Sequence, residues 1–213
     1  MFPYKFIAIE GNIGAGKTTL SRMIHEESNC KLILEQFTDN PFLPFFYEDP
    51  TRYSLPVELF FMTERHKQLQ KELSQSELFS EFIVSDYYFI KTLLFAKNNL
   101  NEEEYRLFKR LFNVLNSTFP EPELIVYLYR SVDNLLANIK NRGRDFEQSI
   151  KGEYLDSIQK AYLNYFKSIE NIPVLVIDVE GSKFWESKDE YEAIKSLIAK
   201  GDYKKGMNYI SLY

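Results

Sequence analysis

The stretch IEGNIGAGKTTL, residues 9–20, decides the fold of this chain. Its central part, GNIGAGKT at 11–18, matches the pattern G-x-x-x-x-G-K-S/T, which is typical of a loop that binds the phosphates of a nucleotide. A run of aromatic and β-branched residues precedes it, YKFIAIE at 4–10, and predicts a buried strand. The residues from 17 to about 28 favour a helix. Because this strand–loop–helix context supports phosphate binding, a chance glycine-rich turn is the weaker interpretation.

The residue types within this loop predict how ATP is held. Glycines let the backbone N–H groups approach the phosphates, and the N-terminus of the following helix adds positive potential. Lys17 is expected to reach the β- and γ-phosphates, and Thr18 to ligate Mg²⁺. The candidate nucleotide-binding residues are Gly11, Asn12, Ile13, Gly14, Ala15, Gly16, Lys17, Thr18 and Thr19. The loop alone leaves open whether the terminal phosphate passes to water, to a small acceptor or nowhere.

Strand and helix signals alternate along the rest of the chain. Short apolar runs predict further strands at 31–37, 81–86, 123–129 and 173–179. Helical stretches are predicted at 57–73, 101–116, 132–141, 153–169 and 189–199. This order predicts an α/β fold of the P-loop type, a five-stranded parallel sheet with helices on both faces. We expect one domain over residues 1–200 and a C-terminal tail at 201–213 with no assigned role.

The predicted strand ends locate the candidate site. Ligands of such sheets bind at the carboxyl ends of the strands. Those ends carry Gly11, Glu35 and Asp86, so three distant segments are expected to meet in one crevice.

Composition limits the partners and the compartment. The 213 residues carry a formal net charge of −5, which disfavours nucleic acid as the main partner. Cys30 is the only cysteine, so no internal disulfide can form, as expected in a reducing compartment. The first residues lack the pattern of a secretory signal, and no apolar run approaches membrane-spanning length. We therefore expect a cytoplasmic protein with no membrane partner.

Three segments give the chain a resemblance to the deoxyribonucleoside kinase family, especially its bacterial deoxyadenosine/deoxyguanosine kinase branch. They are IEGNIGAGKTTL (9–20), LEQFTDNPFLPFFYEDPTRYSLPVELFF (34–61) and RGRDFEQSI (142–150), within a resemblance that runs from 4 to about 198. It implies a P-loop kinase fold with an Arg-containing lid. It also implies transfer of the γ-phosphate of ATP, with Mg²⁺, to the 5′-hydroxyl of a deoxyribonucleoside, in nucleotide salvage, by a homodimer formed through long helices.

The resemblance implies roles for several residues of the acceptor pocket. Glu35 matches the carboxylate that contacts the nucleoside 5′-hydroxyl, where an acid can orient a weak nucleophile and accept its proton. A solvated strand-end acid is the alternative. Tyr47 matches the tyrosine that hydrogen-bonds the 3′-hydroxyl, and the segment 179–183 corresponds to the surroundings of the adenine of ATP.

Two further positions are implied to read the base. Glu58 falls where many members carry a Gln that faces the base edge, and Arg65 matches a base-contacting Arg. Their spacing of seven places both on one helix face, although a surface ion pair would show the same spacing. An ionised carboxylate only accepts hydrogen bonds, so position 58 favours bases that present an amino group. The likeness to the purine-selective branch then favours deoxyadenosine.

The segment RGRDFEQSI corresponds to the lid of the family. Arg142 and Arg144 are expected to clamp phosphoryl oxygens during transfer, and Glu147 matches the acid that reaches back to the 3′-hydroxyl. A basic helix C-terminus that complements the helix dipole is the alternative for the two arginines.

The chain departs from the family at two cationic positions. Where the family usually shows Asp/Glu-Arg-Ser, this chain has SDYYF at 85–89, so Asp86 keeps an acid suited to Mg²⁺ and Tyr87 occupies the place of the Arg. We count Tyr87 among the candidate substrate-binding residues. The earlier lid Arg of the family is Asn138 here, and Lys91 or Lys140 are the candidate replacements.

Two other functions compete with a deoxynucleoside kinase. A nucleoside monophosphate kinase would need cationic groups for the acceptor phosphate, and the pocket loop NPFLPFFYEDP at 40–50 offers none. A nucleotide-binding regulatory module without catalysis would explain the missing arginines. The retained Glu35, Asp86, Arg142 and Glu147 speak against that second alternative.

Overall fold

The computed structural model describes residues 2–36, 40–74 and 80–212. The described strands form one six-stranded sheet in the order β2-β3-β1-β4-β5-β6, and every neighbouring pair is parallel. The strands are β1 (Phe6–Gly11), β2 (Cys30–Ile33), β3 (Phe82–Ser85), β4 (Leu124–Tyr129), β5 (Pro173–Asp178) and β6 (Gly206–Ser211).

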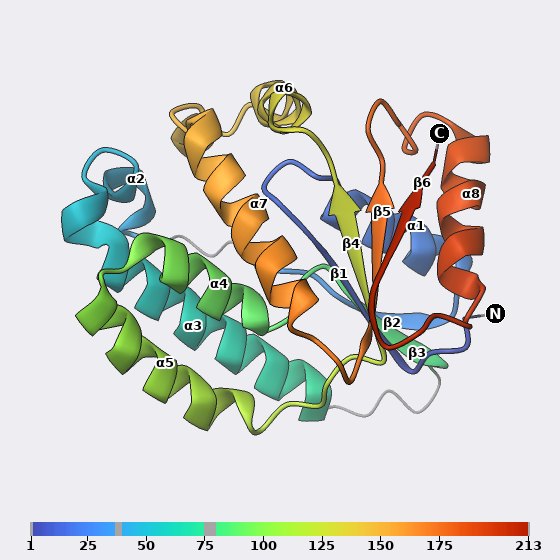
Figure 1. Cartoon of the computed structure of the whole chain (residues 1–213), viewed down its shortest axis with the longest axis horizontal. Helices are drawn as coiled ribbons and strands as arrows, with labels where there is room; N and C mark the ends of the chain where they lie inside the picture. The colour runs from blue at the N-terminus through green and yellow to red at the C-terminus, as the bar shows by residue number, and fades with distance from the viewer. Residues whose placement is uncertain (1, 37–39, 75–79, 213) are drawn as a thin grey trace.

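Helices cover both faces of the sheet (Figure 1). They are α1 (Lys17–Glu27), α2 (Leu43–Phe46), α3 (Pro50–Ser74), α4 (Ile90–Asn99), α5 (Glu102–Asn116), α6 (Val132–Arg142), α7 (Gly152–Lys167) and α8 (Lys188–Ala199), with a short 3-10 helix η1 (Asp145–Glu147). Helices α1 and α8 pack on one face, and α3, α4, α5 and α7 cover the other.

The central strand β1 shows why both faces need this cover. Ile7 and Ile9 belong to the hydrophobic cluster of the α1 and α8 side, whereas Ala8 belongs to the opposite cluster. All three side chains are completely buried. A parallel strand buried on both faces reads as a continuous apolar run, which is the pattern that predicted this strand from the sequence.

The predicted α/β fold with a parallel sheet is confirmed, but the predicted number of five strands is wrong. Residues 206–211 of the expected tail form β6, which pairs in parallel with β5 from Pro173↔Gly206 to Asp178↔Ser211. Its side chains alternate between half-buried and exposed positions, as in a strand at the edge of a sheet. Its three apolar residues, Met207, Tyr209 and Ile210, do not form a continuous apolar run, so sequence reasoning missed this strand.

Two element boundaries also differ from the predictions. The helix expected at 57–73 begins seven residues earlier, at Pro50, so part of the pocket segment that read as a loop is helical. The strand expected at 31–37 ends at Ile33, which leaves Glu35 beyond the sheet. Phe37 and Tyr213, the ends of two predicted segments, lie outside the described residues. Among the described helices, none combines the length and the apolar composition needed to cross a bilayer.

We expect β6 to stabilise the domain through its inner face. Ile210 packs against the core cluster of the α8 side, whereas Met207 on the same strand is 41% exposed. Ile210→Ala should lower the free energy of unfolding by about 1–2 kcal/mol because part of a buried side chain is lost. Urea unfolding followed by circular dichroism measures this change, with Met207→Ala as the matched control. Equal effects of the two substitutions would contradict a stabilising inner face.

Candidate active site

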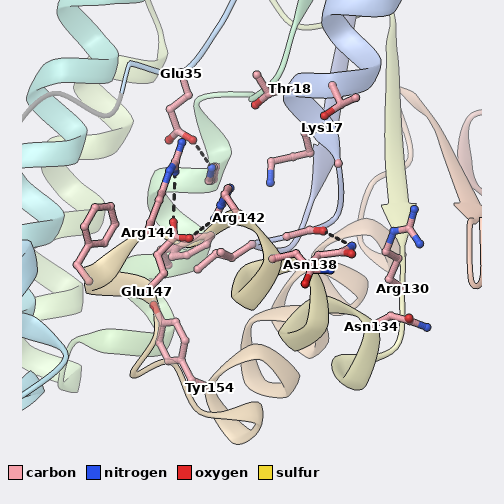
Figure 2. A pocket seen from close by; sticks show the side chains of 18 of the residues that line it. Lys17, Thr18, Glu35, Arg130, Asn134, Asn138, Arg142, Arg144, Glu147 and Tyr154 are labelled. Atoms are coloured by element: carbon pink, nitrogen blue, oxygen red, sulfur yellow. Dashed lines mark hydrogen bonds and ion pairs between the residues drawn. The ribbon is translucent and has the colours of Figure 1, made fainter. Parts of the chain in front are cut away.

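A cleft of about 750 Å³ opens at the carboxyl ends of the strands. Its walls come from the phosphate loop and α1, from α2 to α4, from the segment between α6 and α7, and from the segment after β5. Figure 2 shows part of this arrangement, with Lys17 and Thr18 from α1 and Arg142, Arg144 and Glu147 from the α6–η1 segment. Residues far apart in the sequence therefore share one cavity. Of the three predicted strand-end residues, Glu35 lines it, whereas Gly11 and Asp86 are buried and are not among the lining residues.

The phosphate loop is clamped between two later segments. Gly14 and Gly16 have φ angles of 83° and 99°, in the left-handed region that glycine adopts without strain. A Cβ at Gly14 would lie 2.8 Å from the carbonyl oxygen of Leu135, and one at Gly16 would lie 3.0 Å from a ring carbon of Phe184. Asn138 donates a hydrogen bond of 2.9 Å from Nδ2 to the carbonyl oxygen of Gly14. The residue that replaces a family arginine thus holds the loop to α6.

The predicted nucleotide-binding residues divide into two groups. Those that line the cleft are Ile13, Gly14, Gly16, Lys17, Thr18 and Thr19. Gly11, Asn12 and Ala15 are buried behind them, and Asn12 Nδ2 donates to the carbonyl oxygen of Leu155 on α7 at 2.7 Å. These three residues shape the loop and are not among the residues that line the cleft.

Lys17 is held at the base of the loop. Its Nζ donates to the carbonyl oxygen of Asn12 at 2.8 Å. Burial, and after it the charge of Lys91, lowers the pKa of Lys17 to about 8. A phosphate would stabilise the charged form of this lysine, so the site is prepared to receive an anion.

Thr18 and Asp86 present oxygen atoms side by side. Thr18 Oγ1 donates to Asp86 Oδ2 at 2.5 Å, and the other carboxylate oxygen accepts the backbone N–H of Glu35 at 2.5 Å. Burial raises the pKa of Asp86, and the nearby Glu35 adds to this rise. A hydroxyl and a carboxylate at this spacing are hard oxygen ligands.

Glu35 lies in a buried cluster of charges. Its Oε1 accepts from Arg65 Nε at 2.8 Å and lies 2.7 Å from Arg65 Nη2, and its Oε2 lies 2.5 Å from Lys91 Nζ. Burial would raise the pKa of Glu35, but Lys91 and Arg65 outweigh it and lower the pKa to about 2. The alternative of a solvated strand-end acid is therefore wrong, because the Glu35 side chain is only 3% exposed.

The structure distinguishes the two candidate replacements for the missing arginine. Lys91, on the first turn of α4, contacts Glu35 directly, whereas Lys140 is exposed and is not among the residues that line the cleft.

Tyr87, predicted to bind substrate, does not reach the cleft. Its ring is completely buried in the core, and its hydroxyl donates to Gln68 Oε1 at 3.1 Å. The cation that contacts Glu35 is Lys91 on α4, four residues after Tyr87.

The half of the cleft walled by α2, α3, α4 and the α6–η1 segment, which corresponds to the acceptor pocket of the family resemblance and is called the acceptor half below, contains an incompletely bonded carboxyl group. Glu58 is 2% exposed, and its Oε1 accepts from Asn99 Nδ2 at 2.7 Å. Its Oε2 has no hydrogen-bond partner among the described residues. Burial is the main cause that raises the pKa of Glu58 to about 7, against the lowering effect of Arg65. Glu58 and Arg65 do share one helix face, but both are buried, so the alternative of a surface ion pair is wrong.

Aromatic side chains form the rest of this half. Tyr47 lines the cleft, and its ring meets those of Phe46 and Tyr154 edge-on, with centroids 5.1 Å and 6.5 Å away. Asn99 also donates from Nδ2 to the hydroxyl of Tyr154 at 3.2 Å. Sequence reasoning missed Asn99 and Tyr154, because neither belongs to a recognisable motif.

The α6–η1 segment brings two cations to the cleft. Arg142 and Arg144 both pair with Glu147, the second of them at 3.3 Å. Glu147 is buried, whereas the two arginine side chains are about one third exposed, at 35% and 34%. Gly143 ends α6 with a φ of 69° and turns the chain between the arginines. Arg142 lies in the last turn of α6, as the helix-terminus alternative expects, and the same buried acid also pairs with Arg144 beyond the helix.

Sequence reasoning also missed a cation at the end of β4. Arg130 donates from Nη2 to the carbonyl oxygen of Ser182 at 2.8 Å, and its guanidinium lies 5.5 Å from the centre of the Trp185 ring. Arg130, Ser182 and Trp185 all line the cleft. The signal was available, because Arg130 directly follows a predicted strand, where ligand-binding residues gather.

The parallel sheet and the glycine-rich loop between β1 and α1 place the protein among the α/β P-loop proteins. The profile of the deoxynucleoside kinase family matches residues 7–201. The deoxyguanosine kinase of Bacillus subtilis (strain 168) is 33% identical over 197 residues, which cover 91% of this chain and 95% of that relative. The deoxyadenosine/deoxycytidine kinase of the same strain is 28% identical over 200 residues, 91% of each chain.

A solved structure agrees with these relatives. The deoxyadenosine kinase from M. mycoides, with products dCMP and a flexible dCDP bound, has a TM-score of 0.75 and 26% sequence identity, over 91% of this chain and 98% of that one. The chain therefore belongs to the deoxynucleoside kinase family. It is a phosphotransferase, and its family takes the phosphate from a nucleoside triphosphate.

We expect Lys91→Met to destabilise the protein. Besides its contact with Glu35, Lys91 lowers the pKa values of the buried Glu10 and Asp86, so its loss leaves several buried carboxyl groups less compensated. The free energy of unfolding at neutral pH should fall by about 2–4 kcal/mol, as when one partner of a buried pair is removed. Urea unfolding measures the loss. Lys97→Met, at an exposed position of the same helix, is the control and should change little.

Proposed function

We propose that this protein transfers the γ-phosphate of ATP to the 5′-hydroxyl of a 2′-deoxyribonucleoside in nucleotide salvage, with deoxyadenosine as the favoured acceptor. The observation that carries this proposal is the position of Glu35. Its carboxylate lines the same cleft as the phosphate loop and is held by Arg65 and Lys91 at the start of the acceptor half.

The donor half suits ATP. Lys17 and the backbone N–H groups of the loop would hold the β- and γ-phosphates. Trp185 and the segment from Gly181 to Lys183 line the end of the cleft where the base of the donor would lie. Arg130 supports that segment through its hydrogen bond to Ser182.

Thr18 and Asp86 would hold a magnesium ion. Their adjacent oxygens fit the preference of Mg²⁺ for a few hard protein ligands together with phosphate oxygens and water. Such an ion would supply charge compensation for the phosphates. Asp86 accepts a hydrogen bond from the backbone of Glu35, so the proposed metal ligand and the proposed acceptor-binding residue are in direct contact.

Glu35 would orient the attacking hydroxyl. The 5′-oxygen forms a bond to the γ-phosphorus, the bond to the β–γ bridging oxygen breaks, and the hydroxyl proton passes to the carboxylate. The pKa of about 2 makes Glu35 a weak base towards a free hydroxyl. Proton transfer therefore belongs late in the reaction, when the forming bond has made the hydroxyl acidic, as suits a loose transition state.

The sugar and the base would bind between α2, α3 and the α6–η1 segment. Tyr47 and Glu147 are the candidate partners of the 3′-hydroxyl, and Glu58 and Arg65 lie where the base would enter. Arg65 is already engaged by Glu35, so it would link the base position to the reacting hydroxyl.

Arg142 and Arg144 would act as a lid on the transferring phosphate. Both are partly exposed and lie on a segment that ends at the cleft. Glu147 pairs with both guanidinium groups. Phosphate oxygens could take over part of these bonds, because bidentate arginine–phosphate pairs are strong.

The charges of the acceptor half disfavour a nucleoside monophosphate kinase. Arg65 and Lys91 both contact Glu35 there, and the two arginines of the α6–η1 segment, Arg142 and Arg144, both pair with Glu147, so carboxylates already engage these cations. A regulatory module without catalysis is disfavoured by the intact contacts of Lys17, Glu35 and Asp86.

We also propose that the protein is a homodimer that associates through α5. Leu107, Leu111 and Val114 are exposed by 57%, 43% and 70%, and their spacing places them on one face of this helix. Helix α5 forms the outer layer of the helical side of the molecule (Figure 1). Size-exclusion chromatography with light scattering tests this, and Leu111→Glu should give a monomer.

A phosphotransfer panel tests the proposed activity. The four deoxyribonucleosides, their monophosphates and the four ribonucleosides would be incubated with ATP and Mg²⁺. Product formation from the deoxyribonucleosides supports the proposal. Preferential use of the monophosphates, or the absence of any acceptor among the twelve, would overturn it.

We expect Lys17→Ala to abolish phosphate transfer and to leave the fold intact. The amine contacts a loop carbonyl rather than the core, so its charge acts on the phosphates of the donor. The transfer rate and the circular dichroism spectrum are the two measurements. A folded variant with the turnover of the wild type would rule out the assigned role.

Glu35→Gln should lower kcat by about a hundredfold or more, with a smaller change in KM, because an amide cannot take the hydroxyl proton. Steady-state kinetics measure both constants, and a thermal melt identifies any loss of folding from the unpaired Arg65 and Lys91. A change in KM alone would show that Glu35 only positions the acceptor.

A further inference from the structure

The unpaired oxygen of Glu58 is the feature of the cleft that the proposed reaction leaves without a use. The side chain is 2% exposed, yet its Oε2 has no hydrogen-bond partner among the described residues. A buried polar atom without a partner costs stability unless a ligand satisfies it. Because Glu58 lines the acceptor half of the cleft, a bound molecule is the natural partner.

The bond to Asn99 identifies which oxygen can carry a proton. Asn99 Nδ2 donates to Glu58 Oε1, and its Oδ1 in turn accepts from Asn98 Nδ2 at 3.0 Å. This second bond fixes the orientation of the Asn99 amide. Oε1 is therefore an acceptor in either state of Glu58, and a proton on the carboxyl group resides on Oε2.

The surroundings of Glu58 hold its two protonation states close in free energy. Burial raises the pKa, whereas Arg65 on the same helix, the Asn99 hydrogen bond and Lys91 on α4 lower it, with about 7 as the result. Tyr47 and Tyr154 face the same group from α2 and α7, and both are neutral because their pKa values are raised. None of these described groups holds Glu58 in a single ionisation state, so a bound ligand can determine whether Glu58 is protonated.

Adenine and guanine form complementary hydrogen bonds with opposite protonation states of a carboxyl group. The Watson–Crick edge of adenine presents a donor, the N6 amino group, beside an acceptor, N1. The same edge of guanine presents two donors, N1–H and the N2 amino group. A neutral carboxyl group donates through one oxygen and accepts through the other, whereas a carboxylate only accepts. Adenine thus matches the neutral form, and guanine matches the ionised form.

We propose that the proton on Glu58 Oε2 selects between adenine and guanine, so that the base preference of this kinase reverses or shifts with pH. The inference rests on the proposed function, because it requires the nucleoside base to lie against Glu58. Cytosine presents the same donor–acceptor pair as adenine and follows it.

The direction of the shift follows from the titration. Below the pKa the neutral form dominates and deoxyadenosine gains, and above it the carboxylate dominates and deoxyguanosine gains. If each base binds one form only, the ratio of their kcat/KM values changes about tenfold per pH unit. We expect the ratio of deoxyadenosine to deoxyguanosine to fall at least about tenfold from pH 6 to pH 8, a fraction of that limit.

The experiment compares the two nucleosides on the same enzyme at each pH. Effects of pH on ATP binding, on Lys17 or on the lid cancel in the ratio, and neither base titrates in this range. Glu58→Gln is the matched control, since its amide donates and accepts at every pH. Its ratio should be independent of pH. Asn99→Leu removes a hydrogen bond that lowers the pKa of Glu58, so the midpoint of the change should move to higher pH.

Calorimetry gives a second reading that does not depend on turnover. Near the pKa, deoxyadenosine binding should take up protons and deoxyguanosine binding should release them, which titrations in buffers of different ionisation enthalpy measure. A constant ratio in the wild type, or an equal slope in Glu58→Gln, overturns the inference while leaving the kinase activity established. Failure of both nucleosides as acceptors at every pH would instead overturn the proposed function.

Discussion

The buried contacts of Glu35 with Arg65 and Lys91 are the constraint on which the rest of the site depends. A carboxylate with a 3% exposed side chain is stable only with such partners, and each partner comes from a different helix. Arg65 fixes α3 and Lys91 fixes α4 against the segment after β2. The same three residues therefore hold α3, α4 and the segment after β2 together around this half of the cleft. A change in any of them alters packing and chemistry together.

The two halves of the cleft are built by different physical means. The phosphate loop is shaped by the backbone, since glycines with positive φ lie against Leu135 and Phe184 where no side chain fits. The acceptor half is shaped by side chains whose charges compensate one another. Glu58 is the exception, because one of its oxygens remains unpaired and its ionisation is balanced near neutrality. Glu58 can therefore be neutral or ionised near neutral pH, whereas a glutamine at the same position would stay uncharged.

Local patterns in the sequence were sufficient for the parallel α/β fold and for the position of the phosphate loop between its first strand and first helix. The apolar runs and the G-x-x-x-x-G-K-S/T motif depend on neighbouring residues, and the structure confirms the fold they predict. Glu35 and Asp86 follow strands, so their convergence also followed from topology. The edge strand β6 was missed because a half-exposed strand needs few apolar residues. Tyr87 was assigned to substrate binding from its position in a motif, but its ring is buried in the core.

The sequence by itself determined the parallel α/β class of the fold, the phosphate loop and the family to which the chain belongs, because these depend on short-range periodicity and on contiguous motifs. Only the tertiary structure decided which cation pairs with Glu35, since Lys91 and Lys140 look alike along the chain and differ only in where their helices lie. It also decided the ionisation of Glu58, because burial and the hydrogen bond from Asn99 arise from contacts across 41 residues of sequence. Electrostatic free energies depend on distance and solvent exposure, and neither is written in the order of the residues.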